Sequence, residues 1–356
     1  MKAYSVKTYD AAPYAPPRAA PHAAATRGLG VLVLLAVAAF ACWVVGGRPL
    51  HIGEDTETYA AFFDALGAGL PETRLEIGFV YLSYALRRLG LGLQGYQTAL
   101  FALMLLAVAV AVRINHRRFP PTVAYPTLLC ASLTLLFISP MFVNASINAV
   151  RQGLAAPLVL AALLCFQQRR WVGFAMLGAV AASLHTSSLL YLLCAPALLL
   201  KPNLLRAVAL LACLAYVAGL TMKVVSIGLP SLYTTVMEYT ANDNYRAGVR
   251  IDFAVFTLFW YLLMLGVAPW VRAEARRALA DAASVYLVMA LPFFMIGWGY
   301  FSNRYLLPAW MAMSLILAAA CCYSRIAPLR HPLVLGAGLL ASCGVLYVFV
   351  SRGIVI

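Results

Sequence analysis

The stretch IGFVYLSYALRRL, from Ile77 to Leu89, decides how this chain is arranged in space. It is mostly apolar, but its thirteen residues fall short of the roughly twenty that an α-helix needs to cross a bilayer. Arg87 and Arg88 also place two charges near its end. We therefore expect a re-entrant or interfacial helix near 77–89, which does not cross the membrane.

Composition identifies the membrane as the environment of the remaining chain. Of its 356 residues, 64% are hydrophobic and 11% are charged, and apolar runs recur along nearly the whole length. Only the backbone itself can satisfy backbone polar groups inside a bilayer, so we predict an all-α, polytopic integral membrane protein. About eleven transmembrane helices are expected, near 29–45, 96–112, 122–139, 152–168, 171–184, 187–200, 204–220, 251–271, 282–301, 305–322 and 333–350. They form a single transmembrane domain over 28–356, with outer loops at 47–95 and 221–250.

Residues 1–27 differ from the rest of the chain. They are rich in alanine and proline and carry four cations, Lys2, Lys7, Arg18 and Arg27, against the single acid Asp10. This composition predicts a disordered basic tail on the cytoplasmic side. The apolar run that follows is expected to be an uncleaved signal anchor.

The distribution of cations in the loops supports this arrangement. Beyond residue 96, the loops predicted inside carry twelve lysines and arginines, and those predicted outside carry six. Cytoplasmic loops are enriched in these residues, so a multi-pass protein with its N-terminus inside is expected. A membrane-spanning helix at 77–89 would invert every later loop and reverse the count.

Several kinds of chemistry are disfavoured by what the sequence lacks. The net charge of +14 is spread over short loops, so it reports topology and contact with anionic lipid, and no nucleic acid partner is expected. The eight cysteines lie in or beside apolar runs without a C-x-x-C pair, so neither disulfides nor a metal site is expected. No nucleotide-binding motif and no H-E-x-x-H occurs, so no cofactor is expected. An activated donor would have to arrive through the membrane, as a lipid phosphate.

Arg151 and Gln152 stand at the first turn of the apolar run near 152–168. A cation is unfavourable at a helix N-terminus, which already carries about half a positive charge. Free amide groups beside a guanidinium suit an anion such as a phosphate. Pro157 is expected to kink this helix. The same pattern fits an arginine that extends from the end of a span to the interface.

His185 lies in the turn of a short helical hairpin. Trp171–Leu200 offers thirty residues for two passes, about 45 Å of helix, whereas two crossings need about 60 Å. The turn is therefore expected in a water-filled recess below the outer surface. A neutral histidine there can act as a general base. The alternative is a structural histidine bonded to the neighbouring serine or threonine hydroxyls.

Acids gather in the outer loop 47–95, where six of the chain's twelve lie between His51 and Glu76. Asp55, Tyr59 and Phe63 repeat at helical spacing, so Asp55 is expected to open an amphipathic helix, and a capping role is its simplest explanation. Asn303-Arg304 begins another apolar run and repeats the pattern of a cation at the outer end of a helix. Two such cations favour a phosphate-rich ligand. The alternative is an aromatic belt with a snorkelling arginine.

Five motifs occur in a defined order. They are Arg48 with GED at 53–55, Tyr59 and Phe63; EIGF at 76–79; SINAVRQGLAA at 146–156; ASLHTSS at 182–188; and NRY at 303–305. Together they resemble the EpsG family of membrane polysaccharide polymerases, relatives of Wzy-type O-antigen polymerases, over roughly 48–310. The basic tail lies outside this resemblance.

The resemblance implies a glycosyltransferase of the bacterial inner membrane whose active face is outside. A chain on a polyprenyl pyrophosphate would be transferred to the non-reducing end of a new lipid-linked repeat unit, giving exopolysaccharide or O-antigen. Arg151 and Arg304 would stabilise the pyrophosphate leaving group, and His185 or Asp55 would be the base. Substrate-binding roles would fall to Asn303, Gln152, Glu76, Tyr59 and Arg48. Expected partners are the polyprenyl-pyrophosphate-linked oligosaccharide, membrane lipid, a chain-length regulator and a flippase.

Three alternatives stay open. A polysaccharide ligase would use the same pyrophosphate chemistry. A membrane glycosyltransferase that uses a monophosphate-linked sugar would rely chiefly on Asp55. A transporter or flippase would show internal repeats and charges at mid-membrane depth, and the sequence gives no convincing sign of either.

Overall fold

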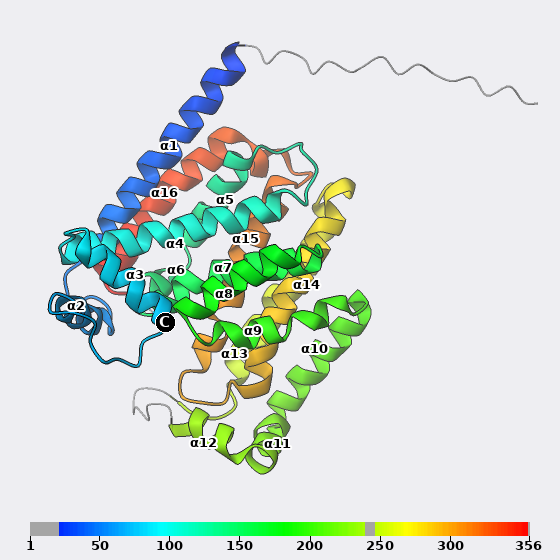
Figure 1. Ribbon diagram of the computed structural model, residues 1–356. Coiled ribbons are helices and arrows are strands. Elements are labelled where there is room, and N and C mark those ends of the chain that lie inside the picture. The colour runs from blue at the N-terminus through cyan, green and yellow to red at the C-terminus, as the bar shows by residue number, and fades with distance from the viewer. Residues whose placement is uncertain (1–20, 239–245, 355–356) are drawn as a thin grey trace, which may run out of the picture.

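The computed structural model describes residues 21–238 and 246–354. Within these ranges the chain forms sixteen α-helices, four 3₁₀ helices and no β-strand, so the all-α prediction is confirmed (Figure 1). The α-helices are α1 (Pro21–Gly46), α2 (Thr56–Ala65), α3 (Ile77–Arg88), α4 (Leu93–His116), α5 (Tyr125–Phe137), α6 (Pro140–Ile147), α7 (Val150–Gln167), α8 (Trp171–Leu184), α9 (Ser188–Leu193), α10 (Pro202–Val217), α11 (Leu220–Gly228), α12 (Pro230–Glu238), α13 (Ile251–Val267), α14 (Ala273–Ile296), α15 (Leu307–Cys322) and α16 (Pro332–Ser351). The 3₁₀ helices are η1 (Ala195–Leu199), η2 (Ala268–Trp270), η3 (Ser302–Tyr305) and η4 (Ala327–Arg330).

Each apolar segment predicted from the sequence is helical. Five described helices are long and apolar enough to cross a membrane: α4, α7, α13 with η2, α14 and α16. Two bent pairs, α5 with α6 and α10 with α11, raise this number to seven if each counts as one span. Four shorter apolar helices, at 30–46, 171–184, 188–199 and 307–322, occupy the remaining predicted positions. The polytopic prediction is confirmed, and the number of crossings stays a prediction.

Proline and glycine explain the two bends. α5 and α6 meet at 82°, and α6 has Pro140 in its first turn. Proline has no amide hydrogen to donate, so it ends the helix before it and begins the next. α10 and α11 also meet at 82°, at Gly219, whose φ of 70° favours glycine. The predicted spans near 122–139 and 204–220 therefore each end in a sharp turn.

The first helix is longer than the sequence suggested. α1 begins at Pro21, inside the tail that was predicted to be disordered over 1–27. Proline suits the first position of a helix, and the alanines that follow it have the highest helix propensity. Residues 21–27 are therefore helical and not disordered, and the domain boundary at residue 28 stays a prediction. Residues 1–20, the rest of that tail, lie outside the described ranges.

α7 is the central helix of the bundle. In its apolar window 83% of the residues are buried inside the protein, against 22% for α13, which faces outward. α7 packs against α4, α8 and α15. Its N-terminal end, with Arg151, lies at the end of the bundle where α2 and α3 are found (Figure 1).

α3 corresponds to the short helix that was expected near 77–89 and was not counted as a membrane span. It has twelve residues, a length of about 18 Å, which is too short to cross a hydrocarbon core of about 30 Å. It packs against α8, α4 and α2. The expected short helix is therefore present, with the predicted bounds.

The loop 221–250, which is predicted to lie outside, contains two short helices, α11 and α12. Large apolar side chains on and beside them are exposed, among them Leu220, Val224 and Ile227. Such a surface suits contact with the membrane interface. Tyr233 of α12 packs against Trp298, with ring centroids 5.2 Å apart. Residues 239–245 of this loop lie outside the described ranges.

The predicted orientation can be tested with single cysteines at exposed positions. We expect that an impermeant maleimide added to intact spheroplasts labels Thr58→Cys on α2 and leaves Arg117→Cys, after α4, unlabelled. The eight native cysteines are all buried or half-buried, so the unmodified protein is the control for background labelling. Labelling of Arg117→Cys alone would reverse the orientation.

Candidate functional site

A cluster of charged and aromatic side chains lies at the end of the bundle formed by α2, α3 and the N-terminal end of α7. We call Glu76, Arg151, His185 and Tyr59 the Glu76 cluster. Its four members come from α2, the start of α3, α7 and the α8–α9 turn, so the fold joins residues up to 126 positions apart. Glu76, Arg151 and His185 are the titratable residues of the motifs at 76–79, 146–156 and 182–188.

The carboxylate of Glu76 is the centre of the cluster. Its Oε2 accepts a hydrogen bond from Nη1 of Arg151 and forms an ion pair with it. Its Oε1 lies 2.9 Å from Nδ1 of His185 and accepts the backbone amide of Thr186 at 3.0 Å. Both carboxylate oxygens are thus used, and the side chain is only 11% exposed. Glu76 therefore joins three segments that are distant in sequence.

Local backbone geometry explains why Glu76 reaches so far. It is the N-cap residue of α3, yet its side chain forms no capping hydrogen bond. Two residues on, a Cβ at Gly78 would lie 2.4 Å from Oγ of Ser183 and 2.7 Å from its carbonyl oxygen. Only glycine lets α3 approach the end of α8 so closely. This approach places Glu76 next to His185, which follows α8.

Arg151 occupies the first turn of α7, as the sequence predicted. Ala149 is the N-cap residue and offers no side chain to the free amides. Nε of Arg151 donates to the hydroxyl of Tyr59 at 3.3 Å, and Nη1 donates to Glu76. Within the described chain Nη2 has no partner, so the guanidinium keeps donors for an anion. Pro157 lies inside the same helix, also as predicted.

Gly153 fixes where Arg151 can lie. A Cβ at this position would be 2.5 Å from the carbonyl oxygen of Ala145 in α6 and 2.6 Å from Cε of Met104 in α4. The start of α7 thus packs directly on the backbone of α6. The arginine-glutamine-glycine motif combines a cation with the small residue that brings its helix into place.

His185 ends α8 in an extended conformation, with φ −156° and ψ 113°. Because Glu76 accepts at Oε1, the neutral imidazole carries its proton on Nδ1, and Nε2 is left as the basic nitrogen. Among the described residues Nε2 has no hydrogen-bond partner. The alternative of a histidine bonded to the neighbouring serine and threonine hydroxyls is not what the structure shows.

A second charged pair, Asp55 and Arg304, lies beside the cluster. Nη2 of Arg304 is 3.7 Å from Oδ2 of Asp55, and the two side chains are 32% and 36% exposed. Asp55 is the N-cap residue of α2 but forms no capping hydrogen bond, so the simple capping explanation fails. The guanidinium of Arg304 also lies 4.3 Å from the ring centroid of Phe301. This pair is looser and more exposed than Glu76 with Arg151.

Two buried side chains fix the turn that carries Arg304. Gln152 donates from Nε2 to the carbonyl oxygen of Arg304. Tyr191 donates to the carbonyl oxygen of Tyr305 at 3.0 Å and lies 3.5 Å from that of Arg304. The 3₁₀ helix η3, with Asn303, is therefore tied to both α7 and α9. Gln152 acts here through its amide, next to the arginine that reaches Glu76.

The electrostatics of the carboxyl groups of Glu76 and Asp55 differ. Burial raises the pKa of the Glu76 carboxyl, but the hydrogen bond with His185 and the charge of Arg151 outweigh it and lower that pKa to about 2. Glu76 is therefore ionised at neutral pH. For Asp55, burial is the largest influence and raises its pKa, against the opposing charges of Arg304 and Arg151. The charges of both arginines thus act on Asp55, so the Glu76–Arg151 pair and the Asp55–Arg304 pair influence each other electrostatically.

Arg48 lies at the edge of this region and not in its centre. It is 8% exposed, donates to the carbonyl oxygen of Val45 at 2.7 Å and lies 3.4 Å from Oγ1 of Thr56. These contacts fix the segment between α1 and α2. In the free protein Arg48 therefore supports the helix that Asp55 precedes.

The arrangement combines two chemical capacities. It offers two guanidinium groups, one with unused donors and one in a loose pair, to a ligand with several negative charges. It also offers a histidine whose tautomer a carboxylate fixes, as a base needs. Buried Oε1 of Gln152 and Oγ of Ser187 and Ser302 have no hydrogen-bond partner in the described ranges, so polar ligand groups or water are expected there. Among the described residues no group of three metal-ligating side chains occurs.

Two contacts of this site were not predicted from the sequence: the hydrogen bond from Tyr191 to the η3 turn and the one from the amide of Thr186 to Glu76. Tyr191 is the one hydroxyl-bearing residue in the apolar helix SLLYLL apart from its first serine, and this signal could have marked it. The amide of Thr186 left no signal, because a backbone group has none in the sequence.

The model of the EpsG family matches residues 31–353, nearly the whole chain. No curated protein and no solved structure matches it.

Proposed function

The chain belongs to the EpsG family, which implies a role like that of a membrane polysaccharide polymerase, and we propose that it joins lipid-linked oligosaccharide repeat units. The growing chain on a polyprenyl pyrophosphate is the donor, and a new lipid-linked repeat unit is the acceptor. The reaction takes place at the outer face of the bacterial inner membrane. A flippase would deliver the repeat units, and a chain-length regulator would act on the product.

The proposed step is a single glycosyl transfer. The oxygen of an acceptor hydroxyl forms a bond to the anomeric carbon of the donor sugar. The bond from that carbon to the pyrophosphate oxygen breaks, and the pyrophosphate leaves with the electron pair. The hydroxyl proton passes to a base of the protein. The products are a chain one repeat unit longer, carried on the lipid of the acceptor, and the free polyprenyl pyrophosphate of the donor.

The leaving group is why two arginines are needed. Negative charge grows on the pyrophosphate as its bond to carbon breaks, and preorganised donors that meet this charge lower the barrier. Arg151 supplies its Nη2 group as a donor, and the first turn of α7 supplies its free backbone amides. The guanidinium of Arg304 lies 3.7 Å from the carboxylate of the partly exposed Asp55, and it gives up this contact to bind the incoming phosphate. Phe301 and the fixed η3 turn keep its guanidinium in place during this exchange.

We assign the base to Nε2 of His185. Glu76 accepts a hydrogen bond from the N–H group at Nδ1, which fixes the tautomer and stabilises the imidazolium that forms when Nε2 takes the proton of the acceptor hydroxyl. Glu76 is thus a positioning residue. Asp55 has a raised pKa but is committed to Arg304, which suits a role in binding the donor. Tyr59 keeps its hydrogen bond with Arg151. Together with Asn303 it lines the side of the site where the substrate binds.

One observation carries this proposal: a single carboxylate contacts both the cation and the base. The Nη1 of Arg151 and the Nδ1 of His185 are bound to the two oxygens of Glu76. The anion site and the proton acceptor therefore lie within the span of one side chain, as a step with a charged leaving group and a nucleophilic hydroxyl requires.

The anion site is tested by Arg151→Ala. We expect the loss of long-chain polysaccharide, with a rate lower by about 10²–10³-fold, because a donor to the leaving group is removed. The measurement is the length distribution of the polymer at equal protein abundance in the membrane. Arg88→Ala, an exposed arginine on α3 at the same end, is the matched control and should leave chain length unchanged. Normal chain lengths with Arg151→Ala would contradict the anion site.

The assignment of the base is tested by comparing His185→Ala with Asp55→Asn. Loss of a general base is expected to lower kcat by about 10²–10⁴-fold in the histidine variant. The asparagine variant keeps the size of the side chain and should change mainly KM for the donor. Steady-state kinetics with purified lipid-linked repeat units measure both. A larger loss of kcat in Asp55→Asn would transfer the role of base to Asp55.

A further inference from the structure

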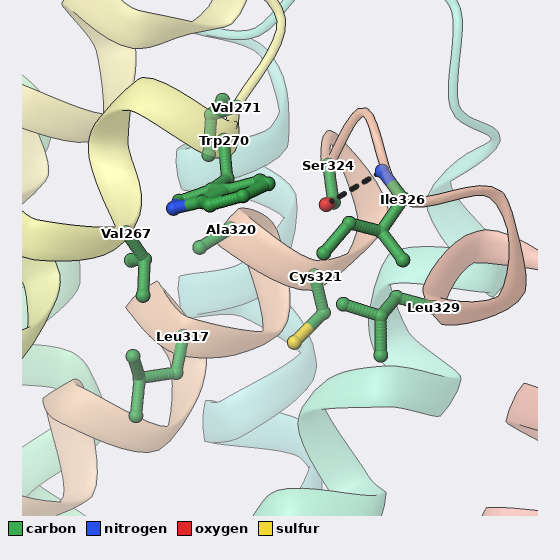
Figure 2. Close-up of a pocket in the computed structure, with 9 residues that line it drawn as sticks. All are labelled: Val267, Trp270, Val271, Leu317, Ala320, Cys321, Ser324, Ile326 and Leu329. Carbon is green, nitrogen blue, oxygen red and sulfur yellow. Dashed lines mark hydrogen bonds between the residues drawn. The ribbon is translucent and has the colours of Figure 1, made fainter.

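A hollow lies at the opposite end of the bundle from the Glu76 cluster. It is enclosed by the end of α13 with η2, the end of α15, and η4. We call it the inner pocket, and its lining includes Val267, Trp270, Leu317, Cys321, Ile326 and Leu329. Figure 2 shows Trp270 on one side, Cys321 from α15 below, and Ile326 and Leu329 opposite. Its volume is about 230 Å³.

The inner pocket is apolar and open at its rim. Trp270 is 61% exposed and Ile326 42% exposed, although both line a concave surface. An apolar cavity of about 150 Å³ is large enough to take benzene, so this one accepts a length of hydrocarbon. Exposed tryptophan is also typical of the boundary between bilayer and water.

Hydrogen bonds hold the rim in a defined shape. The amide of Arg325 donates to the carbonyl oxygen of Trp270 at 2.7 Å, and the amide of Arg272 donates to that of Tyr323 at 3.0 Å. Arg276 donates from Nε to Val271 and from Nη2 to Pro269, at 3.0 and 2.9 Å. The loops 268–277 and 323–331 are therefore joined side by side at the mouth of the inner pocket.

These two loops are strongly basic. They contain five arginines, Arg272, Arg276, Arg277, Arg325 and Arg330, against the single acid Glu274. Arg325 stands between Ser324 and Ile326, which both line the pocket, and Arg272 directly follows Val271, which also lines it. Unlike Arg276, neither side chain has a hydrogen-bond or ion-pair partner within the described ranges. Two uncommitted cations thus adjoin an apolar cavity.

We propose that the inner pocket binds part of one acyl chain of an anionic phospholipid, whose phosphate contacts Arg272 and Arg325. The combination identifies the ligand, because a free phosphate needs no apolar cavity and a neutral apolar molecule needs no cations. In the orientation predicted from the loop charges, these loops lie inside, against the anionic leaflet. The site is separate from the Glu76 cluster and does not depend on the proposed reaction.

Native mass spectrometry of the full-length protein tests this site. The probes are phosphatidylglycerol and phosphatidylcholine with identical acyl chains, titrated into detergent-purified protein. We expect one phosphatidylglycerol molecule to bind preferentially. Each arginine near an anionic surface contributes roughly a fivefold change in affinity, so Arg272→Ala with Arg325→Ala should weaken this binding about 30-fold. Arg277→Ala, an exposed cation of the same loops, should leave it unchanged.

The acyl chain is tested separately by Cys321→Phe, which fills the inner pocket. Phosphatidylglycerol binding should fall in this variant although every arginine is retained. Equal binding of the two lipids, or phosphatidylglycerol binding that survives both Cys321→Phe and the double arginine variant, would overturn the proposal. The arginine variants change loop side chains that are exposed at Arg325 and half-buried at Arg272, so they report on the site even if Cys321→Phe fails to fold.

Discussion

The contact of Glu76 with Arg151 and His185 is the constraint on which this end of the helix bundle depends. One carboxylate connects the start of α3, the start of α7 and the end of α8. The ion pair of Glu76 and Arg151 is half-buried, and removing one partner leaves the other charge uncompensated, at a cost that reaches about 3–5 kcal/mol for a fully buried pair. The pair itself adds little net stability, because both charges had to leave water. Its value lies in the geometry that it imposes.

That geometry requires unusual packing on either side. Gly78 lets α3 touch α8, and Gly153 lets α7 rest on the backbone of α6. Larger side chains would separate the helices and move the carboxylate from its partners. The same motifs therefore contain both the reacting groups and the small residues that bring them together. Arg304 is placed differently, by hydrogen bonds from Gln152 and Tyr191 to its turn.

Hydropathy and loop charge act over the whole chain, so the sequence predicted the class of fold and a common face for these residues, but it did not predict the contacts between them. Asp55, His185, Arg151 and Arg304 were all expected on the outer face, and they lie at one end of the bundle. The central position of Glu76 could not be predicted, since it depends on which acid reaches across from the adjacent helix. Asp55 is the N-cap residue of α2, as expected, but its carboxylate forms no capping hydrogen bond and pairs with Arg304 instead. The inner pocket also could not be predicted, because its lining consists mostly of ordinary apolar residues from segments about fifty positions apart.

The coupling between Glu76 and Arg151 is the most direct test of this organisation. It is measured by unfolding of the purified protein with Glu76→Gln, Arg151→Gln and both substitutions together. If the two side chains share a buried ion pair, the double variant should be more stable than the sum of the single losses predicts, by about 1–3 kcal/mol. Losses that add to within about 0.5 kcal/mol would show that the two residues do not interact, and would contradict the convergence on which the site depends.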